Sequence, residues 1–113
     1  MIDNKTAHEI VSIFNKLNCI VVGSYGRSSH EKEYKDLDFI TIEPLNKIEN
    51  ELKKVVKDVK VTKNGLKYKS FLIDDKYHID VWKTEKESFY KRYLQRTLDK
   101  TKLMYINKIL TKY

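Results

Sequence analysis

The sequence predicts an α+β domain in which helices cover one face of a mixed or antiparallel five-stranded sheet. Two segments, 4–17 and 45–56, repeat apolar residues at helical spacing, and short β-branched or aromatic runs lie between and after them. Asn64-Gly65 separates two of those runs, which is a strong hairpin signal. A length of 113 residues suits a single domain, 1–113. The predicted order is α-β-β-α-β-β-β-α-α.

The first helix is predicted over 4–17, where Asp3 or Thr6 can cap its start. A buried strand follows at 19–22 and ends at Gly23. The polar stretch 24–35 is read as a loop, with room for one helical turn. A second strand is expected over 36–42, where β-branched and aromatic residues return.

The second half begins at Pro44, which suits a first helical position, and its apolar spacing predicts a helix to residue 56. Three consecutive antiparallel strands are then expected. Asn64-Gly65 and a second tight turn at 74–76 would connect them, with positive φ at both Asn64 and Gly65. Two further helices are expected at about 85–94 and 98–112. The three strands cover 59–61, 68–73 and 77–82.

Composition predicts a reducing, intracellular setting for the chain. Cys19 is the single cysteine, so no internal disulfide can form, and three scattered histidines offer no zinc-site spacing. Its apolar strand context predicts that Cys19 is a core residue. No apolar run exceeds four residues and no signal core follows Met1, so we expect a cytoplasmic protein without a membrane span.

Most of the net positive charge lies near the C-terminus. The net charge is +7, yet residues 1–82 carry 14 basic and 13 acidic side chains, whereas 83–113 carry nine and three. Such a segment suits a phosphate backbone of DNA or RNA. The same side chains could equally form solvated helix faces. The densest group contains Arg92, Arg96, Lys100 and Lys102.

Three aspartates carry the chemical signal. Asp36 and Asp38 alternate along a predicted strand, so they share a face about 6.5 Å apart. Asp80 alternates with Ile79 and Val81, which places it on the polar face of a later strand. If the strands are neighbours, three carboxylates converge, and Mg²⁺ is the natural compensation for their repulsion. The alternative is an ordinary solvated sheet surface.

A glycine-containing loop precedes the aspartates. Gly23 and Ser24 directly follow the 19–22 strand, where backbone N–H groups and the Ser hydroxyl can approach a phosphate. Arg27 can donate two parallel hydrogen bonds to phosphate oxygens. Alone, this loop could be a simple turn, but its combination with the three aspartates is far less expected by chance.

The segments 23–27, 36–40 and 77–81 together resemble the nucleotidyltransferase superfamily named after DNA polymerase beta, and most closely the palm of family X DNA polymerases. The resemblance covers about residues 20–110. It implies a palm-like sheet and transfer of a nucleoside monophosphate from an NTP or dNTP to a nucleic-acid 3′-hydroxyl. It assigns two Mg²⁺ ions, or Mn²⁺, to Asp36, Asp38 and Asp80, and assigns nucleotide contacts to Gly23, Ser24 and Arg27. Asp80 would also help to deprotonate the attacking hydroxyl.

The chain departs from the family pattern in three places. The loop from Gly23 to Asp36 is about two residues longer than usual. Tyr93 matches the element that meets the nucleotide sugar, but the glycine of that element is missing. The chain looks like a palm alone, so a second chain could supply further subdomains. Two alternatives stay open: a minimal antitoxin-type nucleotidyltransferase that modifies a protein or a tRNA, and a non-catalytic nucleic-acid-binding module.

Two aromatic residues near Asp80 carry alternatives of their own. Trp82 shares the face of Asp80 and could stack on a base, although a Trp at a strand end usually packs at the core or its rim. His78 lies two residues before Asp80 and is either an ordinary hydrogen-bonded surface histidine or a ligand.

Overall fold

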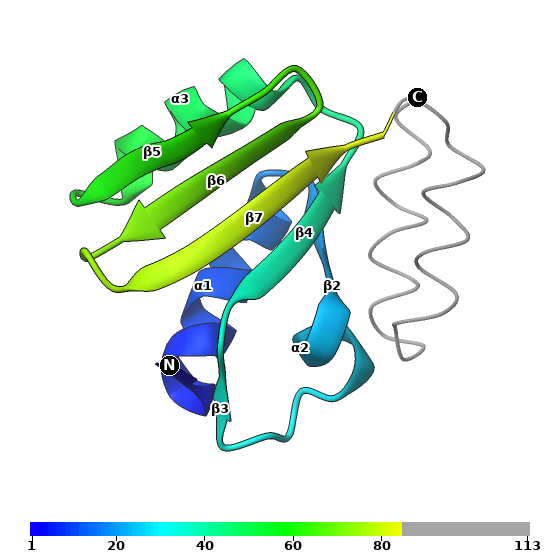
Figure 1. Cartoon of the computed structure of the whole chain (residues 1–113), viewed down its shortest axis with the longest axis vertical. Coiled ribbons are helices and arrows are strands. Elements are labelled where there is room, and N and C mark those ends of the chain that lie inside the picture. The colour runs from blue at the N-terminus through cyan, green and yellow to red at the C-terminus, as the bar shows by residue number, and fades with distance from the viewer. Residues whose placement is uncertain (85–113) are drawn as a thin grey trace.

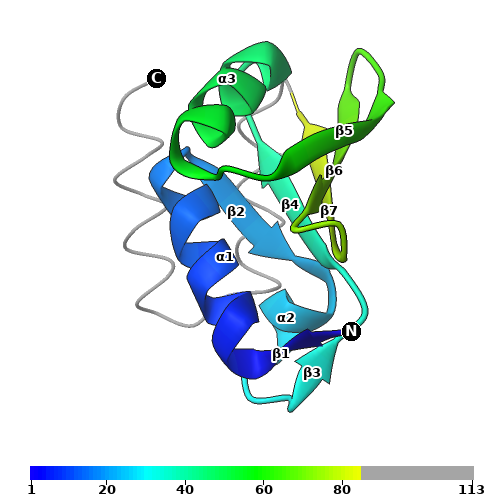
Figure 2. The ribbon, with the colours of Figure 1, turned by 90° about the vertical axis from the view of Figure 1, so that its left-hand side faces the viewer.

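The structure is a computed structural model that describes residues 1–84. A mixed five-stranded sheet with the order β2-β4-β7-β6-β5 forms its centre, and α1 and α3 pack on one face of it (Figures 1 and 2). The predicted helices at 85–94 and 98–112 lie outside the described residues. The elements are β1 (Ile2–Asp3), α1 (Asn4–Lys16), β2 (Cys19–Val22), α2 (Gly23–Arg27), β3 (Glu33–Tyr34), β4 (Leu37–Thr41), α3 (Leu45–Val55), β5 (Val59–Asn64), β6 (Tyr68–Ile73) and β7 (Tyr77–Lys83).

Helix α1 forms where its apolar spacing predicts it. The Asp3 carboxylate accepts a hydrogen bond from the Thr6 backbone N–H at 2.7 Å, so Asp3 is the cap. The chain leaves the helix through Asn18, whose φ of 64° is a left-handed value that asparagine tolerates. Neither α1 nor any other helix among residues 1–84 is long and apolar enough to cross a membrane.

Sheet register brings β4 and β7 together as parallel neighbours, with Asp38 opposite Asp80. Strand β2 pairs antiparallel with β4 on the other side. The expected run of three antiparallel strands, β5, β6 and β7, is confirmed. The β4–β7 pair is parallel and the other three pairs are antiparallel, so the sheet is mixed.

The turn chemistry differs from the prediction. Asn64 ends β5 and only Gly65 enters the turn, and positive φ is found at neither residue. Positive φ occurs instead at Asp74 and Asp75, at 55° and 56°, where Lys76 N–H donates to the Ile73 carbonyl. The turn with two left-handed central residues is therefore the one between β6 and β7.

The main core lies between the sheet and the two helices. The Phe14 ring of α1 stacks on Phe39 of β4 with centroids 4.4 Å apart. Leu52 of α3 and Phe71 of β6 are fully buried in the same cluster. Alternation along each strand sends one set of side chains into this core and the other set to the opposite face.

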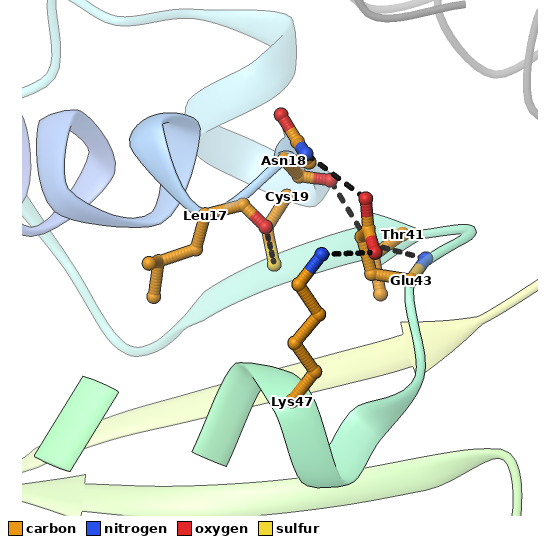
Figure 3. Close-up of polar contacts among 6 residues, drawn as sticks. All are labelled: Leu17, Asn18, Cys19, Thr41, Glu43 and Lys47. Carbon is orange, nitrogen blue, oxygen red and sulfur yellow. Dashed lines mark hydrogen bonds and ion pairs between the residues drawn. The ribbon is translucent and has the colours of Figure 1, made fainter. Parts of the chain in front are cut away.

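Cys19 is buried, as predicted, and burial raises the pKa of its thiol far above the ordinary value. Beside it, buried Glu43 accepts hydrogen bonds from the Asn18 side-chain amide at 3.0 Å and from Lys47 at 3.1 Å (Figure 3). The Thr41 hydroxyl donates to the Asn18 carbonyl and accepts from the Glu43 N–H. These contacts join the end of α1 to the end of β4 and the start of α3.

The segment expected to be a loop is partly regular. Residues 23–27 form the single-turn helix α2, and β3 pairs with β1 in a small second sheet. Ile2 and Tyr34 are register partners in that sheet and both are buried. Two isolated apolar residues in polar surroundings make a weak pattern, so burial in the folded chain, not periodicity, specifies this pairing. The strand expected over 36–42 begins at Leu37 and ends at Thr41.

Candidate functional site

The face of the sheet opposite α1 and α3 carries the candidate site. Register partners of neighbouring strands share a face and form rows across the sheet. One row contains Asp38 of β4 and Asp80 of β7, and it continues into Ser70 of β6. The next row along the strands contains Ile40, Trp82 and Tyr68 in the same order. We call these the acidic row and the aromatic row.

Asp36 precedes β4 and lies beside the acidic row, on the side away from the aromatic row. It lies next to His78, with Asp36 Oδ2 and His78 Nδ1 3.8 Å apart, while His78 Nε2 is 3.5 Å from Asp80 Oδ1. One ligand atom from each of Asp36, His78 and Asp80 lies within 4.8 Å of the other two. The three predicted aspartates are therefore brought together, and a histidine accompanies them.

The charged form of Asp38 is disfavoured here. Burial, followed by the negative charges of Asp36 and Asp80, raises the pKa of the Asp38 carboxyl to about 6, and His78 opposes this shift. Carboxylates in this arrangement need either a proton or a cation. Oxygen ligands of this kind are the donors that Mg²⁺ and Mn²⁺ prefer, so the donor set fits a divalent ion.

Asp80 is oriented by two hydroxyl groups from β6. Its Oδ1 accepts hydrogen bonds from Ser70 Oγ at 2.6 Å and from Tyr68 Oη at 2.7 Å. Ser70 Oγ and Tyr68 Oη are themselves 2.7 Å apart. Burial is the largest cause of a raised pKa at the Tyr68 hydroxyl. The hydroxyl therefore stays protonated and able to donate. One oxygen of Asp80 is therefore held in place by the protein.

Gly23 allows the turn from β2 into α2 to pass against Asp38. Its φ is 69°, and a Cβ atom at this position would lie 2.7 Å from Asp38 Oδ2. Both the backbone conformation and the contact exclude larger residues. The close approach brings the start of α2 beside the acidic row.

Helix α2 is held from its buried side. The Tyr25 hydroxyl shares a hydrogen bond of 2.6 Å with His8 Nδ1 of α1, and burial raises the pKa of Tyr25 to about 12. The rings of Tyr25 and Tyr34 lie 5.1 Å apart. The Tyr34 hydroxyl donates to the Ser28 carbonyl at 2.8 Å. The turn next to Asp38 is thus supported by α1 and by β3.

An open cavity of about 600 Å³ lies beside Gly23 and Asp38, which both line it. Arg27 and Lys83 contribute positive charge to its wall, and Trp82 is 51% exposed at its side. The cavity joins an anion-attracting wall to the Asp38 carboxylate, which suits a ligand with phosphates held through a cation. The full lining is Val22, Gly23, Arg27, Asp38, Ile40, Trp82, Lys83 and Thr84.

The predicted residues fall into three groups. Gly23 and Arg27 line the cavity with Asp38, whereas Asp36 and Asp80 are not part of the lining and lie close to Asp38. Ser24 lies exposed in the first turn of α2 and is not part of the lining. The remaining predicted residues, Tyr93 and the basic group Arg92, Arg96, Lys100 and Lys102, lie outside the described residues.

Ser70 and Tyr68 are functional candidates that the sequence did not reveal. Their alternation along β6 is visible in the sequence, but β6 can pair in more than one register, and only the observed register places Ser70 opposite Asp80. His8 and Tyr25 were likewise ordinary amphipathic positions until the fold brought them together.

No protein-family model matches the chain, and no curated protein has a matching sequence. The class of protein therefore has to be inferred from the residues of the site and from the fold that positions them.

Proposed function

We propose that the protein is a metal-dependent nucleotidyltransferase with a fold like the palm of family X DNA polymerases. It would transfer a nucleoside monophosphate from an NTP or dNTP to the 3′-hydroxyl of a nucleic acid. The observation that carries the proposal is the parallel register of β4 and β7, which sets Asp38 opposite Asp80 with Asp36 and Gly23 beside them. That arrangement combines carboxylates for metal binding with a close backbone approach for phosphate.

Asp36, Asp38 and Asp80 would hold two divalent ions, Mg²⁺ or Mn²⁺. When bound, the ions supply charge that stabilises the developing negative charge on the transferred phosphate. Arg27 at the cavity wall adds a positive side chain toward the same phosphates. The raised pKa of Asp38 supports this assignment, because bound cations would replace the proton that the cluster otherwise attracts.

In the proposed reaction, the acceptor hydroxyl oxygen forms a bond to the α-phosphorus while the bond to the bridging oxygen breaks, and pyrophosphate leaves. The hydroxyl proton goes to a carboxylate, a role that the resemblance to family X polymerases assigns to Asp80. Ser70 and Tyr68 donate to Asp80 Oδ1, so these two hydroxyl groups would hold the carboxylate in position for that step.

The acceptor is inferred from charge. The surplus of basic residues in 83–113 favours a polyanionic acceptor over a neutral one. The experiment uses purified protein with Mg²⁺ or Mn²⁺, labelled NTPs or dNTPs, and single-stranded or primed oligonucleotides. We expect oligonucleotides lengthened by added nucleotides, and no product with Asp38→Asn.

Two results would change the assignment. Label transferred to a protein or a tRNA body, with no extended oligonucleotide, would replace the nucleic-acid 3′-hydroxyl by the antitoxin-type acceptor. Nucleic-acid binding without label on any acceptor, under both metals, would contradict nucleotidyl transfer and favour a binding module.

A further inference from the structure

Trp82 exposes a large aromatic side chain to solvent beside the candidate site. Among the described residues, four large hydrophobic side chains are exposed, and of these Trp82 alone lines the cavity that Asp38 lines. It exposes 51% of its surface there. An exposed indole beside a polar site is a common ligand surface, because its ring offers a large flat area at little conformational cost.

The orientation of the indole is supported by the site itself. Tyr68, its register partner on β6, packs against it with ring centroids 4.2 Å apart at 41°. The Tyr68 hydroxyl is in turn hydrogen-bonded to Asp80 at 2.7 Å. Tyr68 therefore holds Asp80 with its hydroxyl and supports Trp82 with its ring, so the two groups keep a defined relative position.

The aromatic row lies one alternate position beyond the acidic row, about 6.5 Å along the strands. That is roughly the reach of the sugar that joins an α-phosphate to a base. Ile40, the register partner of Trp82 on β4, makes the cavity floor apolar at this level. A ligand with its phosphates at the acidic row would lay its next flat group over Ile40 and Trp82.

We propose that Trp82, supported by Tyr68, is the surface on which the base of the bound nucleotide stacks. The inference rests on the proposed function and adds to it that the ligand is a base-bearing nucleotide, bound largely by stacking and so with little preference among bases. Stacking on an aromatic side chain is sequence-tolerant because every base has a π-face.

Trp82 is the only tryptophan of the chain, so its fluorescence reports on this position directly. The probes are a non-transferable α,β-methylene nucleoside triphosphate and inorganic tripolyphosphate, each titrated with Mg²⁺. We expect the nucleotide to change the Trp82 emission saturably and tripolyphosphate to leave it nearly unchanged. Calorimetry gives the affinities in parallel.

The variants separate stacking from phosphate binding. Trp82→Ala should weaken nucleotide binding about tenfold or more, with tripolyphosphate affinity unchanged, and Trp82→Phe should recover most of the loss. Leu66→Ala is the matched control, because Leu66 is 96% exposed on the turn between β5 and β6 and does not line this cavity. Its nucleotide affinity should equal that of the unaltered protein.

Three outcomes would overturn the inference. Equal affinities of nucleotide and tripolyphosphate, together with an unaffected Trp82→Ala variant, would remove the stacking surface and leave the proposed function intact. An emission change caused only by an oligonucleotide would assign Trp82 to the acceptor. If neither triphosphate binds at all, the proposed function fails along with the stacking surface.

Discussion

At the scale of single residues, the negative charge of Asp38 is unfavourable because the side chain is partly buried and lies near two other aspartates. Burial, as the largest cause, raises its pKa from an ordinary value of 3.8 to about 6 in the folded chain. Between these two values the folded state binds more protons than the unfolded state. The free energy of unfolding therefore falls as pH rises from about 4 to 6, and the loss is complete above the folded pKa.

Asp38→Asn should remove this pH dependence and raise the stability of the metal-free protein near neutral pH. The full shift corresponds to on the order of 2–3 kcal/mol, as an upper bound. The measurement is the free energy of unfolding across this pH range without divalent ions. Asp74→Asn, an exposed aspartate in the turn between β6 and β7, is the control and should retain the wild-type pH profile.

The hydroxyl groups that donate to Asp80 should affect both stability and the rate of transfer. Tyr68→Phe keeps the ring against Trp82 and removes one hydrogen bond to Asp80, and Ser70→Ala removes the other. Each should cost about 1 kcal/mol of stability. Each should also lower the rate of nucleotide transfer at saturating nucleotide.

A structural role alone would lower the melting temperature without changing that rate per folded molecule. Tyr77→Phe is the matched control, because Tyr77 lies on β7 outside the Asp80 hydrogen bonds and packs against the core. Transfer rates of Tyr68→Phe and Ser70→Ala equal to that of Tyr77→Phe would contradict a positioning role.

At the scale of elements, the β2–α2 junction depends on one glycine. Gly23→Ala adds a Cβ that would lie 2.7 Å from Asp38 Oδ2, at a backbone φ of 69°. We expect a loss of about 2 kcal/mol or more in the free energy of unfolding, from the strained backbone and the displaced carboxylate together. Metal binding should weaken as Asp38 moves.

The two causes can be separated by a double-mutant cycle. In an Asp38→Ala background the carboxylate oxygen is gone, so Gly23→Ala should cost only the backbone strain. An equal cost in both backgrounds would show that the approach to Asp38 carries no energetic weight, and that the glycine serves the turn alone.

At the scale of the whole molecule, the proposed ligands should stabilise the folded state. Mg²⁺ and a nucleoside triphosphate together should raise the melting temperature more than either alone, because the triphosphate supplies metal ligands that the aspartates do not. The increase should shrink as pH falls below about 6, where protons compete for Asp38.

Arg27→Ala should reduce the nucleotide-dependent part of that increase, since the side chain lines the cavity and carries positive charge toward it. The Mg²⁺-dependent part should stay as in the unaltered protein. An unchanged response to nucleotide would remove Arg27 from the phosphate contacts.

The basic C-terminal segment predicts the salt dependence of the whole chain. Replacing Arg92, Arg96, Lys100 and Lys102 by Glu should weaken binding to DNA or RNA and flatten its dependence on salt, by up to about 0.9 in log–log slope per lost phosphate contact on a duplex. Nucleotide binding at the aspartates should persist. Unaltered oligonucleotide affinity in this variant would show that these side chains are solvated and contact no phosphates.

The sequence by itself determined the features that depend on local backbone geometry. The spacing of Ala7, Ile10 and Phe14 requires a helical face, and the alternation of Asp36 with Asp38 places both on one side of an extended strand. The hairpin at 64–65 was also predictable, although its turn conformation was not. These patterns repeat about every two to four residues, so the order of side chains along a short segment is enough to predict them.

Only the tertiary structure decided which segments meet. Strands β4 and β7 are separated in the chain by α3 and two other strands. The residues of either strand do not by themselves predict that the other is its parallel neighbour. Pairing Asp38 with Asp80 is unfavourable in isolation, because it brings like charges together. It is imposed by the core residues that alternate with them, Leu37 and Phe39 against Ile79 and Val81, whose burial between the sheet and α1 outweighs that repulsion. The same register sets Ser70 beside Asp80 and Tyr68 beside Trp82, which is why those partners emerged only from the folded chain.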